Sequence, residues 1–389
     1  MLLFTQFFLP DKTGTGKVLG ELFSYLALSN DIDVLSSRQL YNDKSDSVLI
    51  RQEVINGIKI KRVFSKFADK NRPIGRIYNY LAFFTLAILE TIFNKLTDKK
   101  DILVSVSNPP IMPLLPAILK SDKQKFIYIL HDLYPDLPIK MGITSKNSSM
   151  SKFMFAVNNF IFKKADKVVV LGRDMQKYLC ENYHVPITKI NIITNWSEKK
   201  CLDDVDYIGD RFKVIYSGNM GRFHNLEMLV KLAERHYFID LEFIGEGAQK
   251  EALINMVSDL NLKNVVFTDF LDEDKYISKM STANAFAVSL EKNLTGLAVP
   301  SKFYTYLSMG RPIICIAEPE CEMAIVIKES MCGIIAKHDD IDSLCNQVEE
   351  LHRKPQIQVN MGESSKNIFH RFYEKDIVMK QFEKLFGEV

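Results

Sequence analysis

The sequence has few cysteines for its 389 residues, and none of them forms a C-x-x-C pair. Thiols so few and so scattered do not fit a disulfide framework or a zinc site, and they favour a reducing compartment. The six positions are Cys180, Cys201, Cys315, Cys321, Cys332 and Cys345. No short-period repeat or low-complexity tract occurs either.

Long apolar runs are also scarce. Ile77 to Phe93 is the one stretch near membrane-spanning length, and Asn79 and Glu90 interrupt it. About seventeen residues is the lower limit for a bilayer-spanning helix, so we favour a buried core helix. Met1 to Leu9 lacks the basic region of a signal peptide, and Pro10-Asp11 ends its apolar run, so we expect no signal peptide here. We therefore expect a cytoplasmic protein, with at most a peripheral position on the cytoplasmic face of the inner membrane.

The length suits two domains, and 47% hydrophobic with 25% charged residues is the composition of a soluble globular protein. The net charge of +2 hides a split between the halves. Residues 1–195 hold 27 basic and 17 acidic side chains, a net +10, whereas residues 196–389 hold 23 and 31, a net −8. A basic first half favours an anionic partner there, such as a membrane surface or a phosphorylated acceptor; ordinary surface variation is the alternative.

A basic run with interspersed apolar residues precedes the long apolar stretch. Its cations are Lys59, Lys61, Arg62, Lys66, Lys70, Arg72 and Arg76, and Phe64, Phe67 and Ile74 lie among them. This pattern suits attachment of residues 59–93 to the face of an anionic bilayer. A solvated loop explains it equally well.

Strands alternate with helices along the whole chain, and the pattern begins twice. Leu2 to Phe8 is an expected strand, Pro10 to Gly16 a loop and Lys17 to Leu28 a helix. Phe212 to Tyr216, the loop Ser217 to Gly221 and the helix Leu226 to Glu234 repeat this order. Other expected strands are Ile32–Leu35, Ile58–Val63, Ile102–Val106, Phe126–Leu130, Lys167–Leu171, Asp240–Ile244, Val265–Thr268, Ala285–Ser289 and Ile313–Ile316.

Such alternation predicts an α/β protein with two Rossmann-like, doubly wound parallel-sheet domains. We place them at residues 1–196 and 197–370, with a cleft between them. The polar segment Ser197 to Arg211 is the expected linker. A last amphipathic helix, within residues 371–389, is expected to pack back toward the first domain.

Glycine-rich turns follow the first strand of each half. Thr13-Gly14-Thr15-Gly16-Lys17 is not a P-loop, because Asp11 and Val18 stand where that motif needs glycine and a hydroxyl residue. Such a turn before a helix lets the backbone approach an anion, although a tight connection alone explains it. In the second half, Ser217-Gly218-Asn219-Met220-Gly221 is followed by Arg222, a side chain that can hold a phosphate bidentately.

A loop containing Gly296 and Pro300 leads into a short helix that carries Lys302 and ends at Gly310. A lysine just inside a helix N-terminus adds its charge to unpaired backbone N–H groups, and such a place suits a diphosphate. In the first half, His131 follows a strand and opens His-Asp-Leu-Tyr-Pro-Asp, residues 131–136. A capped loop would account for this segment by structure alone.

Taken together, these segments resemble family 4 of the retaining GT-B glycosyltransferases, in the subgroup that builds cell-surface polysaccharides. The resemblance rests on the two glycine loops, His131–Asp136, Gly245-Glu246-Gly247, Val265–Phe270, Ile192–Trp196 and residues 294–316. It implies transfer of a hexose, an N-acetylhexosamine or a deoxy-aminosugar, with retention, from a nucleotide diphosphate sugar, which we expect to be UDP-linked. The implied acceptor is a glycan or a polyprenyl-diphosphate-linked sugar in O-antigen or capsule assembly.

The resemblance also implies which residues form the site. His131 would lie near the transferred sugar, and Arg222 and Lys302 would stabilise the leaving diphosphate. Implied donor contacts are Gly14, Thr15, Gly16, Ser217, Gly218, Asn219, Gly245, Gly247, Phe267, Thr295, Gly296, Leu297, Ala298, Val299, Pro300, Ser301 and Thr305. No acidic metal motif stands near the donor loop, so we expect no metal and no cofactor beyond the donor, and no nucleic-acid partner.

One departure from the family pattern concerns two glutamates eight positions apart in the donor loop. Thr305 occupies the position of the second, and the first has no clear counterpart. A hydroxyl can bond a ribose but not as an ionised carboxylate does. Two alternatives therefore stay open: a sugar-nucleotide epimerase of the same architecture, and a non-catalytic subunit that binds nucleotide sugars.

Overall fold

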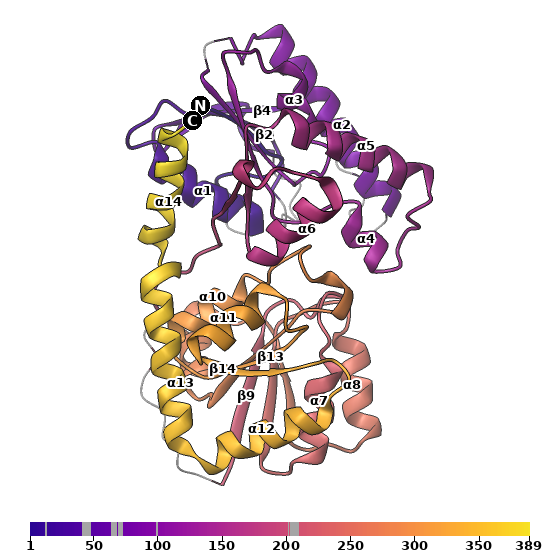
Figure 1. The fold of residues 1–389 in the computed structure, drawn as a ribbon, viewed down its shortest axis with the longest axis vertical. Helices are drawn as coiled ribbons and strands as arrows, with labels where there is room; N and C mark the ends of the chain where they lie inside the picture. The colour runs from indigo at the N-terminus through magenta and orange to yellow at the C-terminus, as the bar shows by residue number, and fades with distance from the viewer. Residues whose placement is uncertain are drawn as a thin grey trace. The chain divides into compact units, whose positions relative to one another are not determined.

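The computed structural model describes residues 1–11, 14–40, 48–63, 68, 73–98, 100–200, 202 and 210–389 (Figure 1). The chain forms two compact units and passes between them four times. Unit 1 comprises Met1–Leu171, Gln176–Ile193 and Met379–Val389, and unit 2 comprises Gly172–Met175 and Thr194–Val378. Most of the expected linker, residues 201 and 203–209, lies outside the described residues.

Unit 1 is built on an eight-stranded sheet in the order β3-β4-β2-β1-β5-β6-β7-β8. All neighbouring pairs are parallel except β3 and β4. The strands are β1 (Leu2–Phe4), β2 (Asp33–Ser37), β3 (Gln52–Ile55), β4 (Ile58–Val63), β5 (Ile102–Val106), β6 (Lys125–Ile129), β7 (Lys167–Val170) and β8 (Ile190–Ile192).

The antiparallel edge is a departure from the expected all-parallel sheet. Asn56 and Gly57 join β3 to β4 and both have positive φ, 51° and 78°. Two such residues form the tight turn that twists with a hairpin, and Asn-Gly is the pair that adopts it most readily. The hairpin therefore adds one strand to the edge of the parallel sheet.

Helices cover both faces of the unit 1 sheet. They are α1 (Gly14–Leu26), α2 (Pro73–Phe93), α3 (Leu114–Leu119), α4 (Asp136–Lys140), α5 (Ser149–Lys164), α6 (Arg173–Tyr183), the short turn η1 (Ile187–Lys189) and the final helix α14 (Lys375–Gly387). α6 begins in unit 2 and continues in unit 1, and α14 does the same.

The long apolar helix α2 packs one face on the sheet. Asn79, Phe83, Ala87 and Thr91 are buried at a spacing of four residues, and Phe83 joins the core around Phe4. This agrees with the preference for a core helix. No helix among the described residues is both long and apolar enough to cross a bilayer.

The end of β1 and the start of α1 differ from the bounds expected from the sequence. β1 ends at Phe4 instead of Phe8. The chain then turns over residues 8–11, where the Asp11 amide donates to the Phe8 carbonyl at 3.0 Å. α1 begins at Gly14 instead of Lys17. The helix lies so close to the preceding turn that a Cβ at Gly16 would stand 2.8 Å from the Asp11 Cβ atom.

Unit 2 has a six-stranded, fully parallel sheet in the order β11-β10-β9-β12-β13-β14. Its strands are β9 (Phe212–Ser217), β10 (Ile239–Ile244), β11 (Val265–Thr268), β12 (Ala285–Ser289), β13 (Ile313–Ile316) and β14 (Gly333–Ala336). The helices and turns are α7 (Glu227–Arg235), α8 (Lys250–Asp259), α9 (Glu273–Ser281), η2 (Lys292–Leu294), α10 (Lys302–Met309), α11 (Glu322–Ser330), α12 (Ile341–Arg353), α13 (Pro355–Ile368) and η3 (Phe369–Tyr373).

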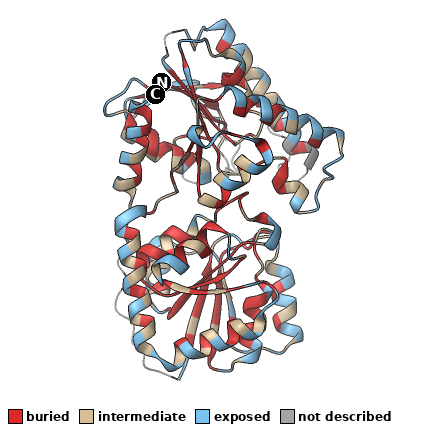
Figure 2. Cartoon of the chain, viewed as in Figure 1, coloured by how far each residue is buried: buried red, intermediate tan, exposed pale blue. Residues whose placement is uncertain are grey.

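The core of unit 2 explains this layered arrangement. α7, α8 and α12 bury their apolar faces against one side of the sheet, with residues such as Leu229, Leu253 and Val348 in a single cluster. α10 and α11 cover the other side, together with α13 (Figure 1). The strands themselves are buried along most of their length (Figure 2). Both units thus have the expected doubly wound α/β architecture.

Candidate active site

The two strands at the centre of the unit 2 sheet separate at their carboxyl ends. β9 and β12 pair only through Ala285 with Val214 and Phe286 with Ile215. The chain winds from β9 outward to β10 on one side and from β12 outward to β13 on the other, so the strand order reverses between them. In open parallel sheets, ligands bind at such a reversal, beyond the carboxyl ends of the strands.

Tyr306 of α10 takes the place of the missing strand partner. Its buried hydroxyl accepts a hydrogen bond from the Ser217 amide at 2.8 Å and donates one to the Ser217 carbonyl at 3.0 Å. The Ser217 hydroxyl also lies 3.3 Å from the Tyr276 hydroxyl. Side chains therefore fix the backbone at the end of β9, where the glycine loop begins.

Three of the predicted glycines allow two loops to touch. Gly218 and Gly245 have φ of 121° and 127°, in the region that favours glycine. A Cβ at Gly245 would stand 2.4 Å from the Gly218 carbonyl oxygen, and one at Gly247 would stand 2.5 Å from the Met220 backbone. The loops after β9 and β10 thus form one backbone surface, and Asn219 is part of it through its carbonyl, which accepts from the Tyr216 hydroxyl at 2.9 Å.

Lys302 reaches this surface from the first turn of α10. Its ammonium nitrogen lies 3.7 Å from the centre of the Tyr216 ring, and a Cβ at Gly218 would stand 3.3 Å from it. This nitrogen is buried and has no hydrogen-bond partner among the residues that the structure describes. Burial lowers the pKa of Lys302 to about 7. The Tyr216 ring offsets part of the cost through a cation–π contact.

A neutral histidine stands beside this lysine. His224 packs its ring against Tyr216, with ring centres 5.9 Å apart, and burial lowers its pKa to about 3. Its Nδ1 lies 2.5 Å from the Ser289 carbonyl, which can only accept, so Nδ1 carries the proton. His224 therefore ties the loop after β9 to the end of β12.

The predicted donor loop is held by an aspartate from a distant part of the chain. The carboxylate of Asp174 accepts from the Gly296 amide and from the Glu322 amide, both at 3.1 Å. Burial raises the pKa of Asp174 to about 6. Leu297, Ala298 and Val299 are buried, so these side chains pack inward while the backbone of the loop follows them.

The remaining predicted residues of unit 2 lie in different surroundings. Thr305 accepts a hydrogen bond from the Ser197 hydroxyl at 3.3 Å. Phe267 stacks on Phe243 of β10 at 5.2 Å, so its ring belongs to the edge of the core. Arg222 is exposed, four residues after Gly218. Thr295 and Pro300 are half-buried, and Ser301 is exposed just before α10.

The predicted residues of unit 1 also follow its central strands. Gly14, Thr15 and Gly16 form the first turn of α1, and the Thr15 hydroxyl accepts from the Asn108 side chain at 3.5 Å. His131 follows β6 and is half-buried, and burial lowers its pKa to about 4. The amides of His131 and Asp132 both donate to the Ser107 hydroxyl at 3.1 Å.

The last residue of the His131–Asp136 segment has a structural role. The buried carboxylate of Asp136 accepts from the hydroxyl of Tyr178 at 2.7 Å and from that of Tyr183. These bonds join the start of α4 to α6. Asp136 therefore holds the segment in place, and its conformation keeps His131 at the end of β6.

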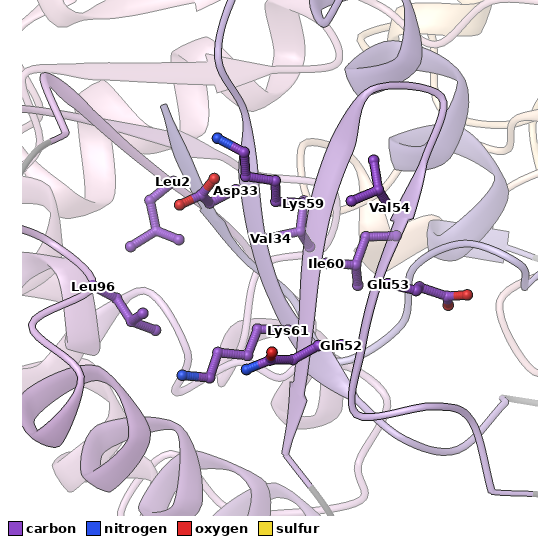
Figure 3. A pocket seen from close by; sticks show the side chains of 10 residues that line it. All are labelled: Leu2, Asp33, Val34, Gln52, Glu53, Val54, Lys59, Ile60, Lys61 and Leu96. Carbon is purple, nitrogen blue, oxygen red and sulfur yellow. The ribbon is translucent and has the colours of Figure 1, made fainter.

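A pocket of about 390 Å³ lies elsewhere in unit 1 (Figure 3). Leu2, Asp33 and Lys59, which line it, stand at the beginnings of β1, β2 and β4 or directly beside them. Parallel sheets bind ligands at the opposite strand ends, so this pocket is not the candidate site.

Sequence reasoning missed several residues of the unit 2 site. Tyr306 stands four residues after Lys302 on the same helix face, and this spacing could have revealed it. Tyr216, His224 and Asp174 gave no such signal, because each meets its partner across a long stretch of chain. Among the described residues, no cluster of three or more metal-ligating side chains occurs.

The geometry of unit 2 can bind a polyphosphate, because two glycine loops at a strand-order reversal, a helix N-terminus and a buried ammonium occur together there. Two family models match the chain. Residues 14–196 match the model "Glycosyltransferase Family 4", and residues 204–368 match "Glycosyl transferases group 1". The chain belongs to the family 4 glycosyltransferases of GT-B fold.

Known relatives are distant in sequence but similar over most of their length. The "Probable glycosyltransferase WbjE" of Pseudomonas aeruginosa is 24% identical over 81% of each chain. The "O-antigen biosynthesis glycosyltransferase WclY" of Escherichia coli is 24% identical over 53% of this chain and 58% of its own.

Solved structures share the fold. A sucrose-phosphate synthase from Thermosynechococcus elongatus has a TM-score of 0.76 and 15% identity, covering 100% of this chain and 98% of its own. Anabaena HepE in complex with UDP-glucose has a TM-score of 0.70 and 13% identity, covering 100% and 99%.

Proposed function

We propose that this protein transfers a hexose or N-acetylhexosamine from a UDP-sugar, with retention of configuration, to a glycan or lipid-linked acceptor in cell-surface polysaccharide assembly. The observation that carries the proposal is the buried ammonium of Lys302 beside Gly218, which has no hydrogen-bond partner among the described residues. A cation in that position is stabilised by an anion, and a nucleotide diphosphate supplies one at the end of β9.

The chemistry follows from charge. Breaking the bond between sugar and diphosphate leaves negative charge on the phosphate oxygens, and Lys302 stabilises it. Arg222 adds a second cation from the loop after β9. In the retaining reaction we propose, the acceptor hydroxyl attacks from the face that the diphosphate leaves, and a phosphate oxygen takes its proton. The protein supplies orientation, His131 lies near the sugar, and no divalent metal takes part.

The Anabaena structure supports UDP as the nucleotide, since it is a complex with UDP-glucose. The Escherichia coli relative supports polysaccharide assembly, since its name refers to O-antigen biosynthesis. Such acceptors are presented at a membrane, so we also propose a peripheral position on the cytoplasmic face, with residues 59–93 as a region of contact. Of its cations, Lys66, Lys70 and Arg72 lie outside the described residues.

A donor screen by thermal shift tests the proposal. UDP-, GDP- and dTDP-sugars are added to the full chain, and the bound nucleotide should raise the melting temperature by mass action. The UDP-sugars should give the largest rise, and Lys302→Ala should abolish it. A rise of equal size in the variant would reject the role given to Lys302.

Two further arms separate the proposed function from its rivals. Formation of a new nucleotide sugar from donor alone would indicate an epimerase, and binding without turnover on lipid-linked acceptors would indicate a non-catalytic subunit. A rate that falls with chelator and returns with Mg²⁺ would contradict metal-independent transfer.

A further inference from the structure

The first turns of α6 and α11 are bonded to each other within unit 2. The buried carboxylate of Glu322, the first residue of α11, accepts from the Arg173 amide at 2.7 Å. In return, the Glu322 amide donates to Asp174, in the first turn of α6, at 3.1 Å. Each helix thus supplies a carboxylate to an amide that has no partner inside the other helix. A Cβ at Gly172 would stand 2.7 Å from the Glu322 Cβ atom, so the two turns approach closely.

The side chain of Arg173 binds two carboxylates of α11. Its Nε and Nη2 atoms donate to Glu322 at 3.0 to 3.2 Å, and its Nη1 atom donates to both oxygens of Glu329 at 2.8 Å. The side chain of Glu322 is 6% exposed, whereas that of Glu329 is 59% exposed. Loss of a partner costs a buried ion pair far more than an exposed one, so the bond to Glu322 is the important one.

Asp174 connects this junction, formed by Arg173, Asp174 and Glu322, to the predicted donor loop. Its Oδ2 atom accepts from the Glu322 amide and from the Gly296 amide, both at 3.1 Å. Its Oδ1 atom accepts from the Met175 amide at 2.7 Å. An ionised carboxylate accepts at both oxygens, whereas protonation turns one of them into a donor. The bond to Gly296 therefore depends on the charge of Asp174.

Two buried acids and one cation meet in this junction. Burial raises the pKa of Asp174 to about 6, and the negative charge of Glu322 acts in the same direction. Arg173 offsets the charge of Glu322. Apart from the ion pairs described above, the titratable groups that face these acids among the described residues are Tyr304 of α10 and Tyr373 of η3. Burial raises the pKa of both hydroxyls, so they stay neutral.

We propose that Arg173 and Glu322 are positioning residues for the donor, because they keep Asp174 in the place and charge state in which it holds Gly296. This inference rests on the proposed function, since it takes residues 295–300 as a loop that contacts the nucleotide sugar. Neither residue touches the donor; each acts through Asp174. Breaking the pair of Arg173 with Glu322 should therefore weaken binding of the nucleotide sugar.

Calorimetric titration of the full chain with UDP-glucose tests the pair. Arg173→Gln leaves the carboxylate of Glu322 buried without a cation, so the Kd should rise about tenfold. Arg173→Lys keeps the charge without the planar fork and should lie between this variant and wild type. Arg173→Gln combined with Glu322→Gln leaves no buried charge and should recover most of the affinity. Urea unfolding shows that each variant is folded.

The pH dependence of this Kd should shift in opposite directions in the two single variants. UDP-glucose carries a phosphate diester, so it lacks the monoester proton that titrates near pH 6. Wild-type affinity should fall below about pH 6, where Asp174 takes up a proton. Arg173→Gln removes a cation and should move this midpoint up by about one pH unit, whereas Glu322→Gln removes a like charge and should move it down. A general loss of stability would not produce opposite signs.

Amide exchange at Gly296 tests the junction without any donor. At pH 7 its protection should fall at least about tenfold in Arg173→Gln and in Asp174→Ala, because the amide loses its acceptor or the acceptor its place. Glu329→Gln is the matched control, since it changes an exposed partner of the same guanidinium. Arg235→Gln removes an exposed cation elsewhere in unit 2, where it pairs with Asp342. Both controls should match wild type within about twofold in Kd and in protection.

Three results would overturn the proposal. The first is a wild-type Kd together with wild-type protection of Gly296 in Arg173→Gln. The second is a midpoint that moves in the same direction in Arg173→Gln and Glu322→Gln. The third is an equal rise of the Kd in Glu329→Gln. Wild-type protein that does not bind UDP-glucose would reject the proposed function and the donor role of this junction; lost protection of Gly296 in Arg173→Gln would then show that the junction only supports the fold.

Discussion

At the scale of single residues, Lys302 shows how a binding site can be recognised from an unfavourable feature. Its ammonium is buried against Tyr216 without a hydrogen-bond partner among the described residues, and this lowers its pKa to about 7. An anion placed beside it would favour the charged form and raise the pKa again. Binding of a diphosphate should therefore take up a proton in the pH range just above 7.

This gives a pH dependence with a definite sign. Lys302 is charged in the complex with UDP, but in the unliganded protein it loses its proton above about pH 7. The affinity for UDP should therefore fall by up to tenfold for each pH unit between pH 7 and 9. Calorimetric titration in buffers of different ionisation enthalpy measures both the affinity and the proton uptake. Lys302→Met should bind more weakly and show neither slope nor uptake. A variant with the wild-type slope would place the titrating group elsewhere.

The same substitution should stabilise the protein without ligand. The folded pKa of Lys302 lies below the ordinary value of 10.5, so the cost of the buried charge is fully present below about pH 7 and disappears as pH rises past 10.5. Lys302→Met should therefore raise the free energy of unfolding at pH 7 by about 1–3 kcal/mol. Urea unfolding at pH 7 measures this, and an unchanged or lower stability would contradict it.

Asp174 gives a second prediction at this scale. Asp174→Ala leaves the amides of Gly296 and Glu322 buried without an acceptor, at about 1–3 kcal/mol for each. Because Gly296 belongs to the donor loop, KM for the nucleotide sugar should rise more than kcat falls. Asp174→Asn keeps an oxygen that accepts from these amides, so its KM and its stability should lie between those of Asp174→Ala and wild type. Steady-state kinetics measures the change in KM, and chemical unfolding measures the loss of stability. An unaltered KM in Asp174→Ala would show that the donor loop keeps its position without Asp174.

At the scale of elements, the end of β9 is held by helix α10 and not by a neighbouring strand. Tyr306→Phe should leave the Ser217 amide and carbonyl unpaired, cost about 1–3 kcal/mol and weaken UDP binding several-fold. Tyr304→Phe is the matched control on the same helix, since its buried hydroxyl has no hydrogen-bond partner among the described residues. Thermal unfolding with and without UDP compares them, and equal effects would contradict the role of Tyr306.

The sequence predicted the elements of unit 2 well. Val265–Thr268, Ala285–Ser289 and Ile313–Ile316 are strands at the expected bounds. The last two are fully buried, and buried parallel strands are continuous apolar runs. α10 ends at Gly310, whose φ of 69° favours glycine. Local patterns thus determine where these elements begin and end.

Contacts between distant segments could not be predicted in this way. Asp174 is 122 residues from Gly296, and nothing near either residue points to the other. The cation–π contact of Lys302 with Tyr216 likewise depends on how α10 packs on the sheet. The β3–β4 hairpin is different, because Asn56-Gly57 is a local signal from which the turn could have been predicted. Among the predicted residues of unit 2, Gly218, Gly245, Gly247 and Lys302 lie near one another, and the roles of all the predicted residues stay predictions.

At the scale of the whole molecule, the final segment of the chain belongs to unit 1. The Phe386 ring packs edge-on against Phe23 of α1 at 6.4 Å, and the Tyr25 hydroxyl donates to Glu383 at 3.0 Å. Phe386→Ala should therefore destabilise unit 1 by about 3–5 kcal/mol. Hydrogen exchange should show faster exchange in α1 but not in α7. Lys384→Ala, an exposed neighbour, should change neither, and unaltered protection of α1 in Phe386→Ala would contradict this role.

The chain passes between its two units four times, and this affects how hybrid enzymes can be built from it. No single cut in the gene separates unit 1 from unit 2, because Met379–Val389 belongs to unit 1 together with Met1–Leu171. A hybrid enzyme that joins the front half of this chain to the rear half of a relative should inherit the last eleven codons from the same parent as the front half. A single crossover at the midpoint would pack α1 of one parent against the C-terminal helix of the other parent.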